Sequence, residues 1–519
     1  MSASAPVRAG DHAGHGPLLE GRDGAGDIFS NQSESEGPRD DVRNHRSAGA
    51  TGSNPLLPGP SGSPGTPAAC CGSLSPVQTA ISDQAAGQDK LAAELPGPPF
   101  RRSVWFIVLV AFALRLAVIL VGRTYRINPL RDHFSFGWEM GRIARSLANG
   151  QGFSSPTDLD TGPSAWAAPV YPWVMAAVFR IFGVYTRSSA FVMLAFNSLF
   201  ASLTCWTLYR TGERVYRESV ARGAAWTWAV FPYIVYWPVR IIWEVSLSTF
   251  LLSLALWLTI RMAGRPRPRD WLLYGSLWGL ILLTNTTLAI LLPFFLAWLL
   301  ARPSQFGRRL SGMAVALVVM ALCLAPWTVR NYRAFGRFVF IRDNLPMELH
   351  QANNDASAGL WTRSEHPGND PVAMQRFERL GEMGFMDEKR AQVRQFIREH
   401  PGQFAAFTAK RVWYFWAAPP QTVVLGGYDL GLVRHVEFLL AACFAFAGLL
   451  LTWHRRNPYR WLLAAFLLIY PLPYYLVNPF QRYKHPIEPV MLLLIVYLLG
   501  ETRKVQLNWH FQSLRPNSG

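Results

Sequence analysis

The chain has 519 residues, of which 50% are hydrophobic and 16% are charged, and it contains 20 Trp and 32 Phe. This composition is typical of a protein that crosses a membrane several times, and it excludes an ordinary soluble domain. The formal net charge of +17 suits a nucleic-acid binder. However, the arginines stand at the ends of apolar segments, so we expect them to orient the chain in a membrane, with no nucleic-acid partner.

The two ends of the chain lack membrane-spanning patterns. Residues 1–100 are rich in Ser, Gly, Pro and Asp and show no periodic apolar pattern, so we expect a disordered cytoplasmic tail. No apolar core follows the start methionine, and therefore no N-terminal signal peptide is predicted. We expect a second cytoplasmic tail at residues 503–519. Residues 101–502 are then expected to form one transmembrane domain.

Ten apolar segments predict an all-α polytopic membrane protein with about ten transmembrane helices. The short turns assigned to the cytoplasmic side are all basic, which places both termini in the cytoplasm. Three external regions follow from this orientation, at residues 123–187, 329–435 and 478–488. The expected spans are Ser103–Gly122, Ser188–Tyr209, Ala221–Pro238, Ile242–Arg261, Trp271–Thr284, Thr287–Leu300, Leu310–Thr328, Val436–Trp453, Tyr459–Val477 and Pro489–Gly500.

One charged residue interrupts the apolar pattern of the first span. Arg115 lies deep within it, where an unpaired charge is costly. We expect a structural partner for it, such as a facing backbone carbonyl, rather than a role in binding substrate.

The first external region contains a predicted surface helix. Its apolar residues recur at helical spacing on one face, which predicts a short amphipathic helix lying flat on the membrane. These residues are Phe136, Met140, Ile143, Ala144 and Leu147. The apolar run Val170–Gly183 that follows is short for a crossing, which needs about 20 residues, so we expect it to be re-entrant or interfacial. The second external region is expected to hold a polar helix near Val372–Glu399.

The order of motifs resembles a known class of enzymes. Asp132 precedes the surface helix, Gly150-Gln-Gly152 ends it, and Pro169-Val-Tyr171-Pro172 follows. Later turns read LLTNTT, RNYRAFGRF and RYKHPIEP. This order is similar to that of the GT-C class of membrane glycosyltransferases. It most resembles the branch with the dolichyl-phosphate-mannose protein mannosyltransferases, the aminoarabinose transferase and the bacterial RgtA/B/C/D-like enzymes. The resemblance implies a GT-C-like helical bundle with external juxtamembrane helices and loops.

The resemblance also implies an activity. A hexosyl- or pentosyltransferase of this kind would move a sugar from a polyprenyl-phosphate donor to a glycan, lipid or protein acceptor, with inversion. It would be a multi-pass protein of the cell (inner) membrane, with its active site external or periplasmic. The acceptor hydroxyl needs a carboxylate base, and the departing lipid phosphate needs fixed cations.

Two other classes of protein compete with this interpretation. One is a non-catalytic or polymer-handling membrane protein of envelope glycan assembly. The other is a lipid or sugar transporter, which the sequence disfavours because it shows no internal repeat and keeps most charges at the two membrane faces.

Three acids compete for the catalytic role. Asp132 occupies the position of the family's loop aspartate, although an N-cap of the surface helix would also suit it. Glu139 is either catalytic or an exposed partner of Arg142 at helical spacing. Glu244 lies at the external mouth of the fourth span, where an acid indicates function by default, unless it pairs with Arg240.

Binding residues are expected in the same external regions. Arg330 follows the seventh span directly, and Arg482, Lys484 and His485 form a second cationic group in a Pro-bounded turn. We expect these four to bind the donor phosphate, with interfacial snorkelling as the alternative for Arg330. Acceptor or sugar contacts are expected from three further residues, Tyr171, Asn353 and Asn354.

No metal site and no cofactor are expected. Asp158-Leu159-Asp160 is similar to the metal-binding Asp-x-Asp of other glycosyltransferases, which leaves a divalent metal as an alternative. The surrounding Ser, Pro, Gly and Thr favour a plain solvated loop instead. No His or Cys cluster has the spacing of a zinc site.

Overall fold

A computed structural model describes residues 103–128, 134–302, 306–362, 365–419, 424–425, 428–429 and 431–513, with side chains as far as residue 502. The expected N-terminal tail and Asp132 lie outside the described residues. Strands β1 (Val424–Leu425) and β2 (Tyr428–Asp429) pair antiparallel and fall in a compact unit separate from the helical one. All helices and sites below belong to the helical unit, which comprises residues 95–421 and 432–519.

The described part of the helical unit consists of α-helices joined by short 3-10 turns. In chain order these elements are α2 (Val104–Val121), η1 (Phe134–Phe136), α3 (Glu139–Ala148), α4 (Val170–Phe182), α5 (Arg187–Val215), α6 (Glu218–Val230), α7 (Pro232–Arg240), α8 (Val245–Arg261), α9 (Pro268–Thr284), η2 (Thr286–Leu291), α10 (Leu292–Leu300), α11 (Phe306–Phe335), α12 (Leu345–Ala352), α13 (Pro371–Glu399), α14 (Pro401–Ala417), α15 (Gly431–His454), α16 (Arg460–Leu468), α17 (Leu472–Leu476), η3 (Gln481–Tyr483), η4 (His485–Ile487) and α18 (Glu488–Ser513).

The prediction of an all-α polytopic membrane protein is confirmed, since each of the ten expected spans contains a helix. Among the described residues, five helical stretches are both long and apolar enough to cross a membrane: α2, α5, α11, α15 and residues 481–502. Two expected spans are broken. Ala221–Pro238 divides into α6 and α7 at Phe231, and Tyr459–Val477 divides into α16 and α17. Prolines explain both breaks, because Pro232 and Pro471 lack the N–H that would continue a helix.

Arg115 stabilises one of these breaks. Pro232 has no N–H to offer the carbonyl of Trp228, and the extended residue Phe231 takes the chain out of the helix. The buried guanidinium of Arg115 donates to the carbonyl oxygens of Trp228 at 3.1 Å and Ala229 at 2.9 Å. The expectation of a facing carbonyl is confirmed. The pairing satisfies backbone groups that would otherwise be exposed to an apolar medium.

Close packing joins α9 to α11. Gly275 and Gly279 are four residues apart on one face of α9. A Cβ on Gly275 would lie 2.3 Å from the carbonyl oxygen of Ala316, and one on Gly279 would lie 2.6 Å from Cβ of Cys323. The two glycines therefore let the helix backbones approach, as small residues do in membrane bundles. At the centre of the bundle, α5 packs against α2, α6, α7 and α8.

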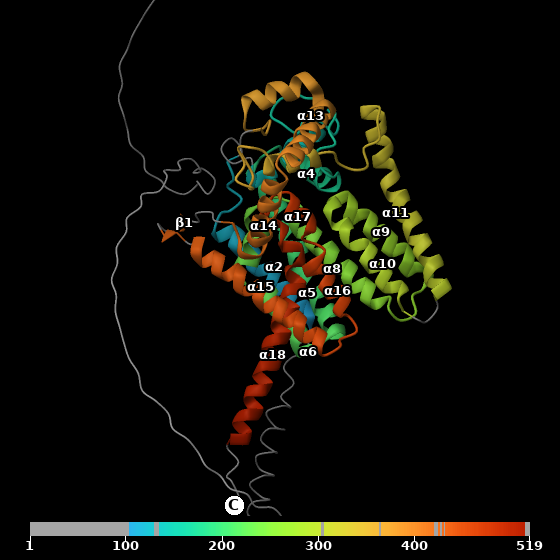
Figure 1. Cartoon of the computed structure of the whole chain (residues 1–519), viewed down its shortest axis with the longest axis vertical. Coiled ribbons are helices and arrows are strands. Elements are labelled where there is room, and N and C mark those ends of the chain that lie inside the picture. Colours follow the sequence, from blue (N-terminus) through green and yellow to red (C-terminus); the bar gives the residue numbers. More distant parts are fainter. Residues whose placement is uncertain are drawn as a thin grey trace, which may run out of the picture. The chain divides into compact units, whose positions relative to one another are not determined.

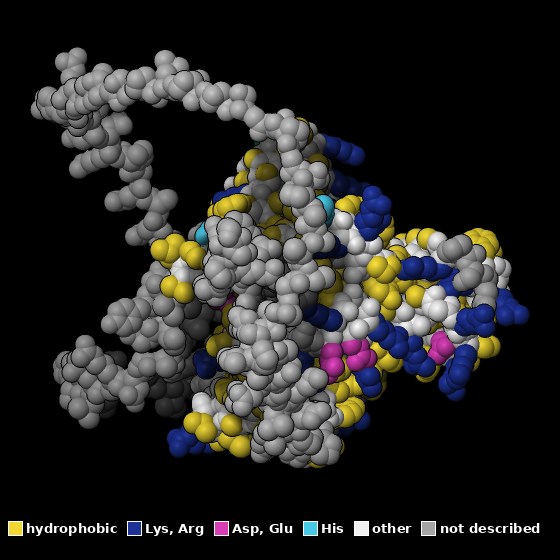
Figure 2. Space-filling view, turned by 90° about the horizontal axis from the view of Figure 1, so that it is seen from below, with side chains coloured by type: hydrophobic (Ala, Val, Ile, Leu, Met, Phe, Trp, Pro, Cys, Tyr) yellow, Lys and Arg dark blue, Asp and Glu magenta, His cyan; other side chains and the backbone are white. Residues whose placement is uncertain are grey.

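One end of the helical unit is rich in basic side chains. Helices α4 and α13 lie at one end, and α6 and α18 extend toward the other (Figure 1). Figure 2 views that second end and shows many Lys and Arg side chains with few acidic ones among them. The positive-inside rule associates such an end with the cytoplasm. The side of the membrane it faces stays a prediction.

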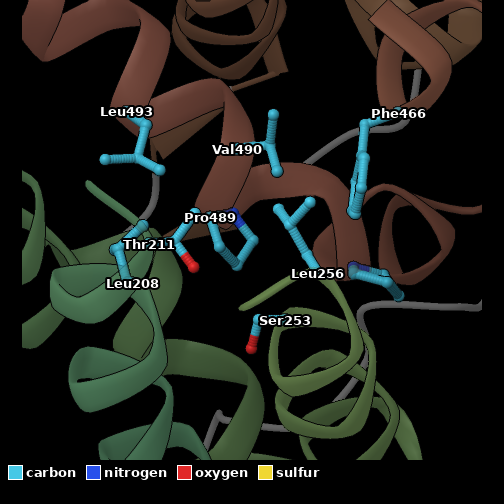
Figure 3. A pocket seen from close by; sticks show the side chains of 9 residues that line it. Leu208, Thr211, Ser253, Leu256, Phe466, Pro489, Val490 and Leu493 are labelled. Carbon is cyan, nitrogen blue, oxygen red and sulfur yellow. The ribbon is translucent and has the colours of Figure 1, made fainter. Parts of the chain in front are cut away.

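The helical unit contains a small cavity and a surface groove. A cavity of about 10 Å³ lies between α5, α8, α16 and the start of α18 and is lined mainly by apolar side chains (Figure 3). This volume is that of about one water molecule. A surface groove of about 500 Å³ also lies beside Leu120, Phe182 and Arg187. The small cavity has no room for a sugar or a lipid chain, and the polar site described next lies elsewhere.

Candidate functional site

The surface helix in the first external region is present, as α3. All five apolar residues of its predicted face are buried, namely Phe136, Met140, Ile143, Ala144 and Leu147. Its polar face is also engaged. Arg142 donates to both carboxylate oxygens of Asp158 at 2.8 Å rather than pairing with Glu139. The Arg142–Glu139 pair, which was the alternative to a catalytic role for Glu139, is not formed among the described residues, and Glu139 binds another partner.

That partner is His366. Its Nε2 lies 3.0 Å from Oε1 of Glu139, and its Nδ1 accepts a hydrogen bond from the Gly368 N–H at 3.0 Å. Because Nδ1 is an acceptor here, the proton of a neutral ring lies on Nε2 and points to Glu139. The rings of Trp138 and Trp166 pack edge-on against the imidazole. His366 is thus held in one orientation and fixes the Glu139 carboxylate.

Glu244 stands in the turn between α7 and α8, and this turn docks on the segment that leads into α3. The Ile242 N–H donates to the Ser135 carbonyl, and Trp243 Nε1 donates to the Phe134 carbonyl, both at 2.9 Å. Asn285 Nδ2 approaches Glu244 Oε1 at 3.5 Å. Among the described residues the buried Oε2 of Glu244 has no hydrogen-bond partner. The carboxylate therefore keeps one oxygen available, and the alternative partner Arg240 is not used.

A short relay of hydrogen bonds fixes Arg342 beside Glu348. Arg342 Nε donates to Asn344 Oδ1 at 2.6 Å, and Asn344 Nδ2 donates to Glu348 Oε1 at 3.2 Å. Both acceptors lie at the start of α12, whose first turn holds Pro346 in place of a backbone donor. The two terminal nitrogens of Arg342 make no hydrogen bond within the described part of the chain. This fork is the geometry that binds a phosphate or carboxylate.

Arg482, in η3, is surrounded by aromatic rings. Its guanidinium carbon lies 4.2 Å from the ring centroid of Trp243, 4.6 Å from that of Phe480 and 5.0 Å from that of Tyr483. Among the described residues its one hydrogen bond runs from Nη2 to the Tyr483 hydroxyl and is 3.3 Å long. Cation–π contacts stabilise the charge without neutralising it. Arg482 therefore presents a positive charge in a largely desolvated place.

These groups act on one another electrostatically. Burial raises the pKa of Glu348 above its ordinary value, the charge of Glu139 raises it further, and Arg342, Arg482 and His366 oppose the shift. Arg482, Arg342 and Glu139 likewise act on Glu244. The acid–arginine cluster therefore comprises Glu139, Glu244, Arg342, Glu348, His366 and Arg482. Among the described residues, no ion pair joins either arginine of the cluster to Glu244 or Glu348.

Arg330 lies in a different environment. Its Nη1 donates to the Ser164 carbonyl at 2.7 Å and its Nη2 to the Phe153 carbonyl at 2.5 Å. The guanidinium also lies over the rings of Trp327 and Phe153. Both terminal nitrogens thus hold the backbone of the first external region. A role in binding phosphate stays a prediction for Arg330, and this geometry gives it a structural role first.

The remaining expected binding residues lie outside the acid–arginine cluster. The Lys484 ammonium lies 3.3 Å from the ring centroid of Phe438, and His485 Nδ1 is 2.7 Å from Glu488 Oε2. Both side chains are buried toward α15 and α18. Three more residues make internal hydrogen bonds: Tyr171 donates to Asn197, Asn353 to the Leu476 carbonyl, and Asn354 to the His350 carbonyl. Their predicted contacts with donor, acceptor or sugar stay predictions.

The Asp158-Leu159-Asp160 loop is occupied by protein partners. Asp158 forms the bidentate pair with Arg142, and Asp160 accepts a hydrogen bond from the Ser155 hydroxyl at 2.9 Å. Among the described residues, no group of three or more His, Cys, Asp or Glu side chains is placed to hold a metal ion. The arrangement of this loop is explained by its own hydrogen bonds. Metal dependence is not tested by it.

Sequence reasoning missed three members of the cluster: Arg342, Glu348 and His366. All three come from the long second external region, at points where its chain enters a helix or turn. One signal was available. The sequence RDNLPMEL places an arginine, an aspartate and an asparagine directly before a proline-containing first helical turn, in an external region where polar residues often serve function.

Comparison with known families gives one match. Residues 166–329 match the family described as dolichyl-phosphate-mannose-protein mannosyltransferase. This segment runs from just before α4 to residue 329, within the last two turns of α11, and it contains Glu244 and Asn285. The resemblance expected from the sequence is confirmed over this part of the chain. No curated protein matches the chain.

Several solved structures are similar to the chain at low identity. The archaeal oligosaccharyltransferase AglB from Archaeoglobus fulgidus, in complex with an inhibitory peptide and a dolichol-phosphate, is 16% identical with a TM-score of 0.47. The match covers 80% of this chain and 52% of that one. ArnT from Cupriavidus metallidurans, bound to undecaprenyl phosphate, is 15% identical with a TM-score of 0.34, over 76% of this chain and 77% of that one. The chain thus spans about half the length of the archaeal enzyme.

Proposed function

We propose that the chain is a membrane glycosyltransferase that transfers a sugar from a polyprenyl-phosphate donor to an acceptor hydroxyl at the acid–arginine cluster. The proposal rests on one observation: the acids and the arginines of this cluster lie near one another but are not paired. Glu244 and Glu348 face Arg342 and Arg482 without forming ion pairs among the described residues. Buried charges without partners are expensive. A site that binds a phosphate and deprotonates a hydroxyl requires such an arrangement.

The roles follow from the geometry of each residue. The forked guanidinium of Arg342 and the caged guanidinium of Arg482 bind the donor phosphate and stabilise the negative charge that grows on it as the bond to the sugar breaks. Glu244 accepts the proton of the acceptor hydroxyl through its unpaired oxygen while Asn285 holds the other oxygen. His366 and Glu139 orient the sugar or the acceptor through their hydrogen-bonded pair. The hydroxyl oxygen attacks the anomeric carbon, polyprenyl phosphate leaves, and the configuration inverts.

Asp132 remains the competing base. The turn that carries Glu244 docks on Phe134 and Ser135, only a few residues along the chain from Asp132. Family resemblance favours Asp132 and the described geometry favours Glu244. A variant of each, compared under the same conditions, decides between them.

A transfer assay tests the proposal. Purified full-length protein in lipid vesicles is supplied with polyprenyl-phosphate hexoses and pentoses and with an extract of cell-envelope glycolipids. We expect release of polyprenyl phosphate together with a glycolipid whose mass has increased by one sugar. If no donor is consumed, while the same preparation binds glycolipid or glycan polymer, the non-catalytic alternative is favoured instead.

Accessibility to reagents tests the proposed external position of the cluster. Single cysteines are placed at Glu378 on α13 and at Ser219 in the first turn of α6, in a variant whose own five cysteines are replaced. Both positions are exposed. We expect a membrane-impermeant thiol reagent to label the cysteine at 378 on intact cells and the one at 219 after lysis alone. The reverse pattern would place the cluster on the cytoplasmic side.

A further inference from the structure

Two buried acids meet beside one residue of the first external region. The Asp343 N–H donates to the carbonyl oxygen of Ala165 at 3.0 Å, and the Ala165 N–H donates to Glu382 Oε1 at 2.5 Å. The exposed fraction is 9% for Asp343 and 4% for Glu382. The two carboxyl groups thus come from distant parts of the chain, one directly after Arg342 and the other in α13. Neither belongs to the acid–arginine cluster.

The described residues supply these acids with very few hydrogen-bond donors. Asp343 Oδ1, Asp343 Oδ2 and Glu382 Oε2 are buried and have no hydrogen-bond partner among them. Two ionised carboxylates in such a place would repel each other and would lack solvation. A proton held between them supplies the missing donor and removes one of the two charges.

Among the described residues, none of the neighbouring arginines forms an ion pair with these acids. Arg330 uses both terminal nitrogens on backbone carbonyls, and Arg337 pairs with Asp387 at 2.6 Å. Arg342 donates to Asn344. Each of these arginines acts on the pair at a distance, and none forms an ion pair with it among the described residues. The charge of the acids is therefore not cancelled locally.

The electrostatics agree with this geometry. Burial raises the pKa of Asp343 to about 7, against the opposing effects of its own backbone, Arg337 and Arg342. Burial and the charge of Asp343 raise the pKa of Glu382 well above its ordinary value, while the Ala165 N–H, the Ser164 hydroxyl and Arg330 oppose the shift. Both shifts favour the protonated form near neutral pH.

We propose that Asp343 and Glu382 share one proton at neutral pH, and that this carboxyl–carboxylate hydrogen bond fastens α13 and Ala165 to the segment that carries Arg342. The attachment point on α13 follows directly on Gly381, where the helix is interrupted by a φ of +67°. Loss of the proton places two negative charges against each other and releases this junction. The acid pair is therefore a positioning device for Arg342. It does not depend on the proposed transfer reaction, since its tests read protonation and stability.

Infrared spectroscopy of the purified full-length protein tests the shared proton directly. We expect the spectrum of the wild type minus that of Glu382→Gln, at neutral pH, to contain the carbonyl band of one protonated carboxyl group. Asp343→Asn should lose the same band, which keeps the test open if one variant folds poorly. Glu378→Gln is the matched control, because Glu378 is an exposed glutamate on the same helix. A difference spectrum without a neutral-carboxyl band would overturn the proposal.

Thermal unfolding gives a second test. Since both pKa values are raised, the folded chain holds more protons than the unfolded chain between the ordinary carboxyl values and the raised ones. The stability that the pair contributes is therefore greatest in acid and is lost as the pH rises toward the raised values. We expect Tm to fall between about pH 5 and about pH 8 in the wild type and in Glu378→Gln, and to fall less in Glu382→Gln. An equal fall in all three proteins would contradict a shared proton.

Discussion

Arg330 and Arg482 are both expected at external ends of spans, yet their surroundings differ. Arg330 donates through both terminal nitrogens to the backbone carbonyls of Phe153 and Ser164. Arg482 is surrounded by aromatic rings and makes one long hydrogen bond, to Tyr483. The comparison teaches that burial of an arginine does not by itself indicate function. A guanidinium whose donors are used by the backbone supports structure, and one with spare donors beside unpaired acids is free to bind an anion.

The largest expected effect concerns Glu244, the proposed base in the acid–arginine cluster. Glu244→Gln keeps the size of the side chain and its contact with Asn285 but does not accept a proton. We expect turnover to fall by about 10² to 10⁴, the usual worth of general-base catalysis, with little change in donor binding. Initial rates with a saturating donor measure the effect. Near-normal turnover in Glu244→Gln, together with an inactive Asp132→Asn, would move the base to Asp132.

Removal of the positive charge of Arg482, which aromatic rings surround, should weaken donor binding. Arg482→Ala removes a charge placed to contact the phosphate before and during the reaction, so we expect the Kd for polyprenyl phosphate to rise roughly 10- to 100-fold. Arg482→Lys keeps the charge but loses the planar fork, and it should fall between the wild type and the alanine variant. Binding is measured by titration with polyprenyl phosphate alone. Unchanged affinity in both variants would remove Arg482 from the site.

The matched change at Arg330 should act on stability instead. Arg330→Ala leaves the Ser164 carbonyl without its donor and leaves the Phe153 carbonyl with the Ser164 N–H alone, which should lower the free energy of unfolding by about 1–3 kcal/mol. Thermal or denaturant unfolding measures this, and Arg333→Ala, at an exposed arginine on the same helix, is the control. If Arg330→Ala kept its stability and lost affinity for polyprenyl phosphate, Arg330 would be a phosphate ligand as the sequence suggested.

The smallest effect is expected at a surface pair beside the buried acids. Arg337 and Asp387 are 38% and 46% exposed, so Asp387→Asn should cost less than about 1 kcal/mol. The hydrogen bond from Arg337 holds the pKa of Asp387 below its ordinary value. Its contribution is therefore present at neutral pH and lost as the pH falls through that lowered value, opposite in sign to the Asp343–Glu382 pair. Tm measured toward acid pH checks the difference.

What the sequence predicted well depended on local pattern. The buried face of α3 followed from the spacing of Met140, Ile143 and Leu147, and the carbonyl partners of Arg115 followed from the cost of a charge in an apolar span. The sequence analysis predicted one unbroken span at Ala221–Pro238 and did not predict the break at Phe231, although Pro232 was visible in the sequence. A run of apolar residues predicts a span but does not show where the helix within it is interrupted.

The partners in the site were not predictable in the same way. Glu139 lies one helical turn from Arg142, yet it binds His366, which is 227 residues further along the chain. Arg142 instead pairs with Asp158, which is 16 residues away. Spacing along a helix limits which residues are able to meet, but the folded arrangement of loops decides which of them do. The cluster therefore forms where all three external regions meet the turn that carries Glu244.

The Arg115 pairing also constrains the order in which the chain is made. Insertion of an arginine near the middle of a span is unfavourable by about 2.5–3.5 kcal/mol on scales measured with the translocon. The carbonyls that bind it belong to residues 113 and 114 positions later. Until α6 has been synthesised, Arg115 has only the Ala111 carbonyl of its own helix as a partner, at 3.0 Å. Assembly of this bundle is therefore sequential, and a hydrophobic replacement of Arg115 would ease insertion of the first span while weakening the finished protein.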